Sequence, residues 1–258
     1  MLLPLLLGAV RAFSADYCAD QYVLALAERG QIAALSVDAE KDFSYLREAA
    51  EGLPQARADA EQVAAARADI VIRFWGGDAR RLTRLGAKVV TLEYAADFAG
   101  VRRNILAAAA ALGRKDEGEA LVRDMELRLD ALARRGASGE AALYVTPGGV
   151  TAGTGTMVDA IFGAAGVENI AASQGLSYWP PLAAESLIAN PPKTIVTGFF
   201  ASDSERINHW SAARHPALRK TMAATLRIDL PADVLACPGW FALDAAETIR
   251  SSIEATGG

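Results

Sequence analysis

Residues 115–135 read KDEGEALVRDMELRLDALARR, and this stretch decides how the chain is organised. It contains no proline, and its apolar residues recur at helical spacing: Leu121, Val122, Met125, Leu129 and Leu132. The opposite face carries acid-before-base pairs four residues apart, such as Asp124 and Arg128. A helix of this length spans about 30 Å. Because α/β patterns lie on both sides of it, we expect one long backbone helix that joins two lobes, with a ligand cleft between them whose opening changes little.

Short apolar runs alternate with helical patterns along both halves of the chain. Such alternation favours parallel sheets covered by helices on both faces, so we expect two Rossmann-like α/β lobes. The expected boundaries are residues 11–113 for the N-terminal lobe, 114–136 for the connecting helix and 137–258 for the C-terminal lobe. The expected strands are Ala12–Tyr17, Ile32–Val37, Ile70–Phe74, Val89–Tyr94, Ala142–Thr146, Thr194–Phe199, Leu226–Leu230 and Val234–Cys237. The expected helices include Phe43–Glu51, Thr156–Ala165, Pro216–Ala224 and Leu243–Ala255.

The composition bounds the class of protein. The chain has 258 residues, of which 52% are hydrophobic and 22% charged, with a net charge of -5. Scattered Lys and Arg within an acidic chain argue against a nucleic-acid binder, and no apolar run approaches the roughly 20 residues of a membrane span. We interpret residues 1–10 as a remnant of a signal peptide, leaving the true start and cleavage site open.

Aromatic residues gather where the expected strands end. In open α/β sheets, ligands bind beyond the carboxyl ends of the strands. All four tryptophans fall in connecting segments, and aromatic walls suit a bulky, mostly apolar ligand. The candidate residues at these ends are Tyr17, Cys18, Phe43, Tyr45, Arg73, Phe74, Trp75, Trp179, Phe199, His209, Trp210, Cys237, Trp240 and Phe241. Among them, Arg73 is suited to pair with an anionic group of a ligand.

Enzyme signatures are missing from the sequence. The glycine-rich segment 148–155 has no P-loop lysine, although its amides could hold an anion, and no G-x-S-x-G motif occurs. Two histidines, His209 and His215, cannot alone build a zinc or manganese cage. We therefore expect no catalytic residue, no resident metal and no cofactor. The alternative is a two-lobed, transferase-like α/β enzyme that acts on a substrate held between its lobes.

The two cysteines leave three possibilities open. Cys18 and Cys237 each close an expected strand, one in each lobe. They could be buried free thiols, a disulfide of an oxidising compartment, or thiolates that contact a metal in the ligand. A disulfide needs Cα atoms within about 7 Å, which the sequence cannot establish.

Several segments, in this order, resemble the periplasmic substrate-binding proteins of ABC importers for cobalamin and ferric siderophores. The resemblance covers nearly the whole chain from Arg11. The segments that carry it are 16–21 (DYCADQ), 60–63 (AEQV), 68–72 (ADIVI), 107–113 with the helix that follows, 151–156 (TAGTGT), 166–170 (GVENI), and 181–185 before 194–196.

This resemblance implies a cleft that holds one ligand and a monomer that delivers the ligand from the periplasm to an inner-membrane permease with its ATPase. In the cobalamin-binding relatives, aromatic side chains line the cleft. The matching positions here are Phe43 or Tyr45, Phe74–Trp75, Trp179 and Trp240–Phe241. Two features depart from those relatives, because Ala242 and Leu243 replace polar residues and the disulfide of the second lobe has no matching cysteines. A corrinoid, a ferric chelate and haem therefore remain alternatives.

The resemblance also implies a docking role for two acidic residues. It places one on each lobe, where they meet arginines of the permease, and the matching residues are Glu61 and Glu185. Each begins a helix that precedes an expected strand. The alternative role is that of first-turn acids, which the helix dipole favours by about 0.3–1 kcal/mol.

Overall fold

A computed structural model describes residues 10–75, 80–84, 86–182, 184–199, 220 and 223–257. The described chain divides into two compact units. The first comprises the chain up to Tyr94 together with Arg103–Val122, and the second comprises Ala95–Arg102 together with the chain from Arg123. The expected helix Pro216–Ala224 falls mostly outside the described residues.

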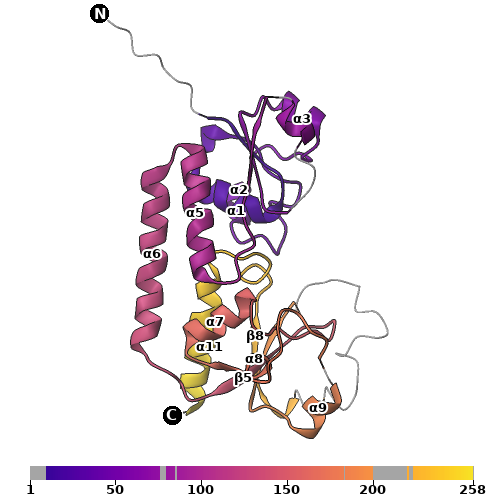
Figure 1. Ribbon diagram of the computed structural model, residues 1–258, viewed down its shortest axis with the longest axis vertical. Coiled ribbons are helices and arrows are strands. Elements are labelled where there is room, and N and C mark those ends of the chain that lie inside the picture. The colour runs from indigo at the N-terminus through magenta and orange to yellow at the C-terminus, as the bar shows by residue number, and fades with distance from the viewer. Residues whose placement is uncertain are drawn as a thin grey trace, which may run out of the picture. The chain divides into compact units, whose positions relative to one another are not determined.

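The first unit is built on a parallel sheet with strand order β2-β1-β3-β4. Figure 1 draws this sheet in indigo and purple. Its strands are β1 (Ala12–Ser14), β2 (Ile32–Ala34), β3 (Ile70–Arg73) and β4 (Lys88–Thr91). Between them lie α1 (Tyr17–Leu26), the 3-10 helix η1 (Arg29–Gln31), α2 (Arg47–Ala50), α3 (Ala60–Ala65) and α4 (Arg80–Thr83). The expected alternation of strand and helix in this half is confirmed. The expected helix Phe43–Glu51 shrinks to α2, because side chains of α1 hold the residues before it.

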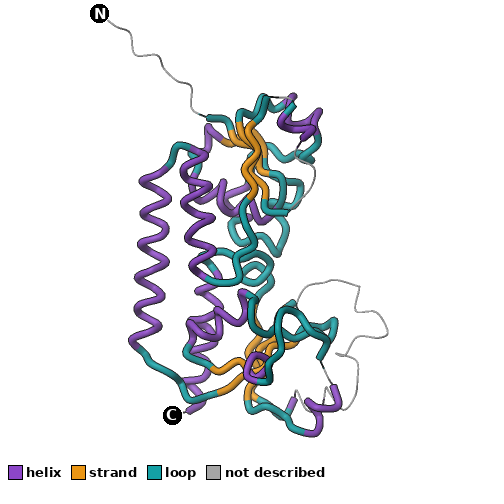
Figure 2. Tube along the Cα trace, viewed as in Figure 1, coloured by secondary structure: helices purple, strands orange, loops and turns teal. Residues whose placement is uncertain are grey.

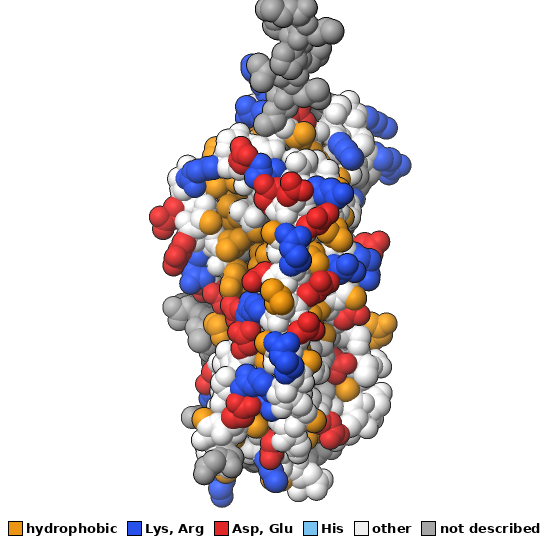
Figure 3. Space-filling model, turned by 90° about the vertical axis from the view of Figure 1, so that its left-hand side faces the viewer, with side chains coloured by type: hydrophobic (Ala, Val, Ile, Leu, Met, Phe, Trp, Pro, Cys, Tyr) orange, Lys and Arg blue, Asp and Glu red, His pale blue; other side chains and the backbone are white. Residues whose placement is uncertain are grey.

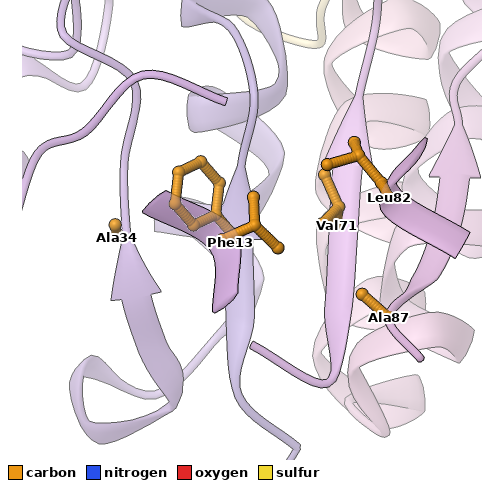
Figure 4. Close-up of a cluster of buried hydrophobic side chains, with 6 residues drawn as sticks. Phe13, Ala34, Val71, Leu82 and Ala87 are labelled. Carbon is orange, nitrogen blue, oxygen red and sulfur yellow. The ribbon is translucent and has the colours of Figure 1, made fainter. Parts of the chain in front are cut away.

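Apolar side chains from three of these strands form part of the core of the first unit. Phe13 of β1 and Val71 of β3 are fully buried beside Ala34 of β2, and Leu82 and Ala87 join the same cluster (Figure 4). A strand as short as β1 buries too little apolar surface to be stable by itself, so the core is formed by several elements together. The near-continuous apolar character of these strands is typical of parallel strands covered on both faces.

The second unit repeats this architecture with the strand order β6-β5-β7-β8, again all parallel. Figure 2 colours the strands of both sheets orange and the helices purple. Its strands are β5 (Ala141–Val145), β6 (Glu168–Asn169), β7 (Thr194–Gly198) and β8 (Leu226–Leu230), and its helices are α7 (Met157–Ala165), α8 (Ile170–Ser173), α9 (Ala184–Ala189) and α11 (Ala242–Gly257). The expected strand Val234–Cys237 is wrong. Both Leu235 and Ala236 donate their backbone N–H to the Ala232 carbonyl, which makes a tight turn there.

Two long helices, α5 (Phe98–Leu112) and α6 (Lys115–Arg134), contribute residues to both units. They are separated at Gly113, whose φ of +70° lies in the left-handed region that favours glycine. The helices approach closely, since a Cβ placed on Gly118 would lie 2.4 Å from that of Ala109. The expected long helix at 115–135 is therefore confirmed as α6.

The polar face of α6 is used differently from the sequence expectation. The Arg128 guanidinium, which the sequence pairs with Asp124, donates to Asp244 at 2.6 Å and to Glu247 at 2.9 Å. Both acceptors belong to α11, so α6 is tied to the last helix of the second unit. Figure 3 shows acidic and basic side chains interspersed over the face that carries α6. No helix among the described residues is long and apolar enough to cross a membrane.

Candidate functional site

The first unit gathers aromatic side chains just beyond the carboxyl ends of β1 and β3. Tyr17 begins α1, and its ring meets that of Phe43 edge-on with centroids 5.0 Å apart. Trp75 follows β3, is 47% exposed and hydrogen-bonds the Tyr17 side chain. Burial, followed by the nearby charges of Asp16 and Asp38, raises the pKa of the Tyr17 phenol. The phenol is therefore neutral at physiological pH.

One carboxylate holds the start of α1 to the loop that carries Trp75. Asp16 caps α1, because its Oδ1 accepts the backbone N–H of Ala19 at 2.9 Å. Its Oδ2 accepts the backbone N–H of Phe74 at 2.8 Å and that of Trp75 at 3.1 Å. Hydrogen bonds to an ionised carboxylate are stronger than those between neutral groups. Asp16 thus fixes where the Trp75 loop begins.

Two further side chains of α1 hold the loop after β2. Asp20 is fully buried, with Oδ1 accepting the Ser36 N–H at 2.9 Å and Oδ2 accepting the Ser36 hydroxyl at 2.6 Å. Gln21 donates to Ser44 Oγ at 2.9 Å and accepts the Leu46 N–H at 2.8 Å. Burial raises the pKa of Asp20 to about 6, against the hydrogen bonds that lower it.

These contacts position the aromatic residues of that loop. Phe43 and Tyr45 flank Ser44, which Gln21 holds, and both are half-buried.

The Arg73 Nε, at the end of β3, donates to Thr91 Oγ1 at 2.8 Å on the neighbouring strand. Phe74 is buried, and its ring lies 5.2 Å from that of Trp75. The exposed apolar surface here is therefore formed by Trp75, with Phe74 beneath it as support.

The second unit presents its aromatic side chains on a turn between two paired segments, 149–155 and 176–182. The Tyr178 N–H donates to the Thr154 carbonyl at 2.8 Å, and the Thr154 N–H donates to the Leu176 carbonyl at 3.0 Å. The Gly153 N–H donates to Tyr178 O at 2.8 Å. A Cβ on Gly153 would lie 2.1 Å from the Leu176 carbonyl oxygen, so only glycine permits this close pairing.

This turn leaves two large rings in solvent. Tyr178 is 67% exposed and has a φ of +58°, an uncommon conformation for a residue other than glycine. Trp179 is 46% exposed, and its ring lies 6.3 Å from that of the buried Tyr144 on β5. Such exposure of neighbouring aromatic rings is typical of binding surfaces. We call Tyr178 and Trp179 of the second unit and Trp75 of the first unit the exposed aromatic set.

Other predicted ligand residues lie in different surroundings. Trp240 is only 8% exposed, and Phe241 is fully buried against it with ring centroids 5.3 Å apart. Phe199 is half-buried directly after β7, with a φ of +64°. His209 and Trp210 lie outside the described residues. The prediction that these residues bind a ligand therefore stays a prediction, and the Phe241 ring has no exposed surface to offer in this structure.

The cysteines are not free thiols. Both Cys18 and Cys237 are buried and disulfide-bonded. A disulfide sulfur has no thiolate to offer a metal, since the thiolate is the ligating form. Among the described residues, no group of three His, Cys, Asp or Glu side chains could hold a metal ion.

The two acidic residues assigned to docking both lie on helices. Glu61 is exposed in the first turn of α3, two residues after Asp59, which caps that helix through the Gln62 N–H at 2.9 Å. Glu185 lies in α9. Nothing in the described structure tests their contact with a partner.

Sequence reasoning missed several residues of this site. Tyr178 is more exposed than its neighbour Trp179, and Tyr94 is 49% exposed after β4. The adjacent aromatic pair in 177–181 was the available signal for Tyr178. The roles of Asp16, Asp20 and Gln21 depend on contacts with distant loops, which spacing within the sequence does not reveal.

The comparison with protein families decides the class. The model of the family described as periplasmic binding protein matches residues 14–224. The chain belongs to the periplasmic binding protein family. This is a family of binding proteins, which argues against the enzyme alternative. The expected resemblance and the expected two-unit α/β fold are thereby confirmed. No match was found among curated protein sequences.

Solved structures of periplasmic binding proteins share the fold. The heme-binding protein HutB of Vibrio cholerae has a TM-score of 0.76 at 21% identity, covering 95% of this chain and 98% of its own. The heme-binding protein RhuT of Roseiflexus sp. RS-1, in apo form, has a TM-score of 0.70 at 23% identity, covering 95% and 100%. The vitamin B12-binding protein BtuF of Vibrio cholerae has a TM-score of 0.70 at 21% identity, covering 95% and 96%. At these identities, the likeness establishes the fold alone.

Proposed function

We propose that this periplasmic binding protein is the ligand-capturing component of an ABC import system. Its ligand would be a corrinoid, a ferric chelate or a haem-like molecule, and it would pass the ligand to an inner-membrane permease that works with an ATPase. The protein itself would perform no chemistry on the ligand and would act in the periplasm as a monomer. Proteins of similar fold that bind heme and vitamin B12 support this ligand class.

The observation that carries the proposal is the exposed aromatic set. Trp75 and Trp179 each leave nearly half of the side chain in solvent, and Tyr178 leaves more. Large rings held on rigid backbone offer contact area at low cost in conformational entropy. A flat macrocycle or a bulky chelate presents the apolar faces that such rings bind.

The polar groups near these rings favour a ligand that carries hydrogen-bond acceptors or anionic groups at its edge. Tyr17 is a neutral phenol that can donate, and Arg73 carries the positive charge at the end of β3. The first unit also carries Asp38 near Tyr17, which would disfavour an anionic group at that point. We infer that an acidic group of the ligand would approach Arg73 and avoid Asp38.

Docking to the permease is proposed for Glu61 and Glu185. Glu61 is exposed on α3, and Glu185 lies on α9, each on a helix that precedes a central strand of its sheet. Such carboxylates can form charge-assisted hydrogen bonds with arginines of a partner. The ligand and the permease would therefore contact different residues.

The proposal is tested by identifying what the protein carries when it is made in a periplasm. Native mass spectrometry and an absorbance scan of freshly released protein would detect a corrinoid, haem or a ferric chelate, all of which are coloured. We expect one such species bound to each chain, and the same species should rebind after denaturation and refolding. A colourless, small polar metabolite found in its place would contradict the proposed ligand class.

A further inference from the structure

The second unit contains a pocket that is lined by none of the exposed aromatic residues. It measures roughly 450 Å³, and its lining residues come from β5, α8, α9 with the residues after it, and the paired segments 149–155 and 176–182. Its lining residues are Leu143, Thr151, Ile170, Gln174, Leu176, Pro181, Leu182, Leu187, Asn190 and Pro192. Pockets of about 300–1,000 Å³ hold small organic molecules.

Most of the described lining residues are apolar. Leu143 and Leu187 belong to a cluster of buried side chains, against which Ile170, Leu176 and Leu182 also pack. The polar residues among the described lining are Thr151, Gln174 and Asn190, and none of the described lining residues carries a charge at neutral pH. Burying a charge without a partner is costly. The chemistry of this lining thus favours a neutral molecule.

One lining residue has an unmet hydrogen bond. Thr151 is 1% exposed, and within the described part of the chain its hydroxyl Oγ1 has no hydrogen-bond partner. The backbone of Thr151 is satisfied, because its N–H donates to the Pro180 carbonyl at 3.0 Å. Buried hydroxyls nearly always have a partner, so an orphaned one in a pocket wall indicates that a partner from outside the chain belongs there.

We propose that this pocket binds a second, small ligand: a neutral, mainly apolar molecule whose single hydroxyl or carbonyl pairs with the Thr151 hydroxyl. Its apolar part would contact Leu143, Leu176 and Leu187. The site is separate from the transport ligand of the proposed function and does not depend on it.

A molecule bound in this pocket would restrict the motion of the turn that carries Tyr178 and Trp179. Leu176 precedes Tyr178, and Pro181 and Leu182 follow Trp179, so both arms of the turn line the pocket. The Leu182 N–H donates to the Gly149 carbonyl at 2.8 Å, which connects the arm to the opposite segment. A molecule in the pocket would pack against both arms and hold the turn in one position.

A matched pair of probes tests the assignment. Benzyl alcohol carries the hydroxyl that the site requires, whereas toluene has nearly the same shape without it. Binding of each is measured by the chemical shifts of 13C-labelled leucine methyl groups, in the wild type and in Thr151→Val. Valine has nearly the shape of threonine with a methyl group in place of the hydroxyl, so the variant removes the hydrogen-bonding group from the pocket wall. We expect the ratio of benzyl alcohol to toluene affinity to fall by about tenfold in Thr151→Val, as for the loss of one hydrogen bond.

A second variant separates this pocket from other apolar sites. Leu176→Trp would fill the pocket and should abolish the shifts of the Leu143 and Leu187 methyl groups with both probes, while circular dichroism confirms that the variant is folded. Should Leu176→Trp be unfolded, the Thr151→Val ratio alone decides. The proposal is overturned when neither probe shifts these methyl groups up to its solubility, which would indicate a dry packing gap, or when the affinity ratio is the same in wild type and Thr151→Val.

Discussion

The Asp16 carboxylate holds Trp75 through its backbone, with Oδ2 accepting the Trp75 N–H at 3.1 Å. The same carboxylate caps α1 through the Ala19 N–H, so one side chain connects a helix start with an aromatic loop. The exposed Trp75 side chain therefore belongs to a loop whose first residues, Phe74 and Trp75, are held by hydrogen bonds. This relationship makes Asp16 a positioning residue whose loss can be measured without touching the aromatic ring itself.

Asp16→Asn is expected to weaken ligand binding by about tenfold. Asparagine caps a helix as well as aspartate does. Its side chain has one oxygen, however, which can accept either the Ala19 N–H or the N–H groups of Phe74 and Trp75. The NH2 group would then face the remaining N–H donors, with which it cannot form hydrogen bonds. Affinity is measured by equilibrium titration with whichever coloured ligand the protein binds.

Asp59→Asn provides the matched control for that experiment. Asp59 caps α3 in the same manner, through the Gln62 N–H, on a helix away from the Trp75 loop in sequence. Its variant should bind as tightly as the wild type. Equal affinity of Asp16→Asn and Asp59→Asn would show that the loop keeps its position without the carboxylate.

Asp20 should make the stability of the protein depend on pH between about 4 and 6. Its pKa in the folded protein, about 6, lies above its ordinary value of 3.8, because burial disfavours the charged form. The folded state therefore binds the proton more tightly, and the stabilisation that results is complete below about pH 4 and is lost as the pH rises through 6. A shift of this size corresponds to roughly 3 kcal/mol at most.

Denaturant unfolding of the wild type and Asp20→Asn across this pH range checks the prediction. The difference in the free energy of unfolding between the two proteins should change in favour of the variant as the pH rises from 4 to 6, since asparagine does not titrate. The other carboxylates titrate in both proteins and cancel in the difference. A difference that stays constant over the range would mean that Asp20 is solvated more than its burial implies.

Charge reversal at Glu61 and Glu185 should separate docking from ligand binding. The double variant Glu61→Lys, Glu185→Lys is expected to bind ligand normally but to abolish uptake by the importer reconstituted in liposomes. Glu48→Lys is the control, because Glu48, like Glu61, is an exposed acid in the first turn of its helix, which is α2. Transport at the wild-type rate by the double variant would remove the docking assignment.

The regular elements could be predicted from sequence because local patterns determine them. Strand Ile70–Arg73 and helix α6 agree with expectation to within one residue, since an apolar run rich in β-branched residues favours a strand and an apolar stripe sustained over 20 residues favours a helix. The segment Val234–Cys237 has the composition of a strand, yet the N–H groups of Leu235 and Ala236 donate to the Ala232 carbonyl in a tight turn. Short apolar runs are ambiguous for this reason.

The candidate site was predictable only in part. Placing aromatic residues at strand ends picked out Trp75 and Trp179, whose rings are exposed, and Tyr17 and Phe43, whose half-buried rings meet edge-on, while their role in ligand binding stays a prediction. The same rule included Phe241, which packs inside the protein, because sequence position does not reveal which way a ring turns. The contacts of Asp16 with Phe74 and Trp75 join residues 58 and 59 positions apart, beyond what any local pattern specifies.

The central claim, capture of a bulky coloured ligand by the exposed aromatic set, is tested most directly by tryptophan fluorescence titrations. Hemin, cyanocobalamin and a ferric hydroxamate siderophore are titrated into the wild type, Trp75→Ala, Trp179→Ala and the control Leu127→Ala, which removes an exposed apolar side chain of α6. We predict that at least one ligand quenches the wild-type fluorescence, that each tryptophan variant binds it more weakly by about 1–3 kcal/mol, and that Leu127→Ala binds normally. The account is contradicted if none of the three ligands binds, or if both tryptophan variants bind as tightly as the wild type.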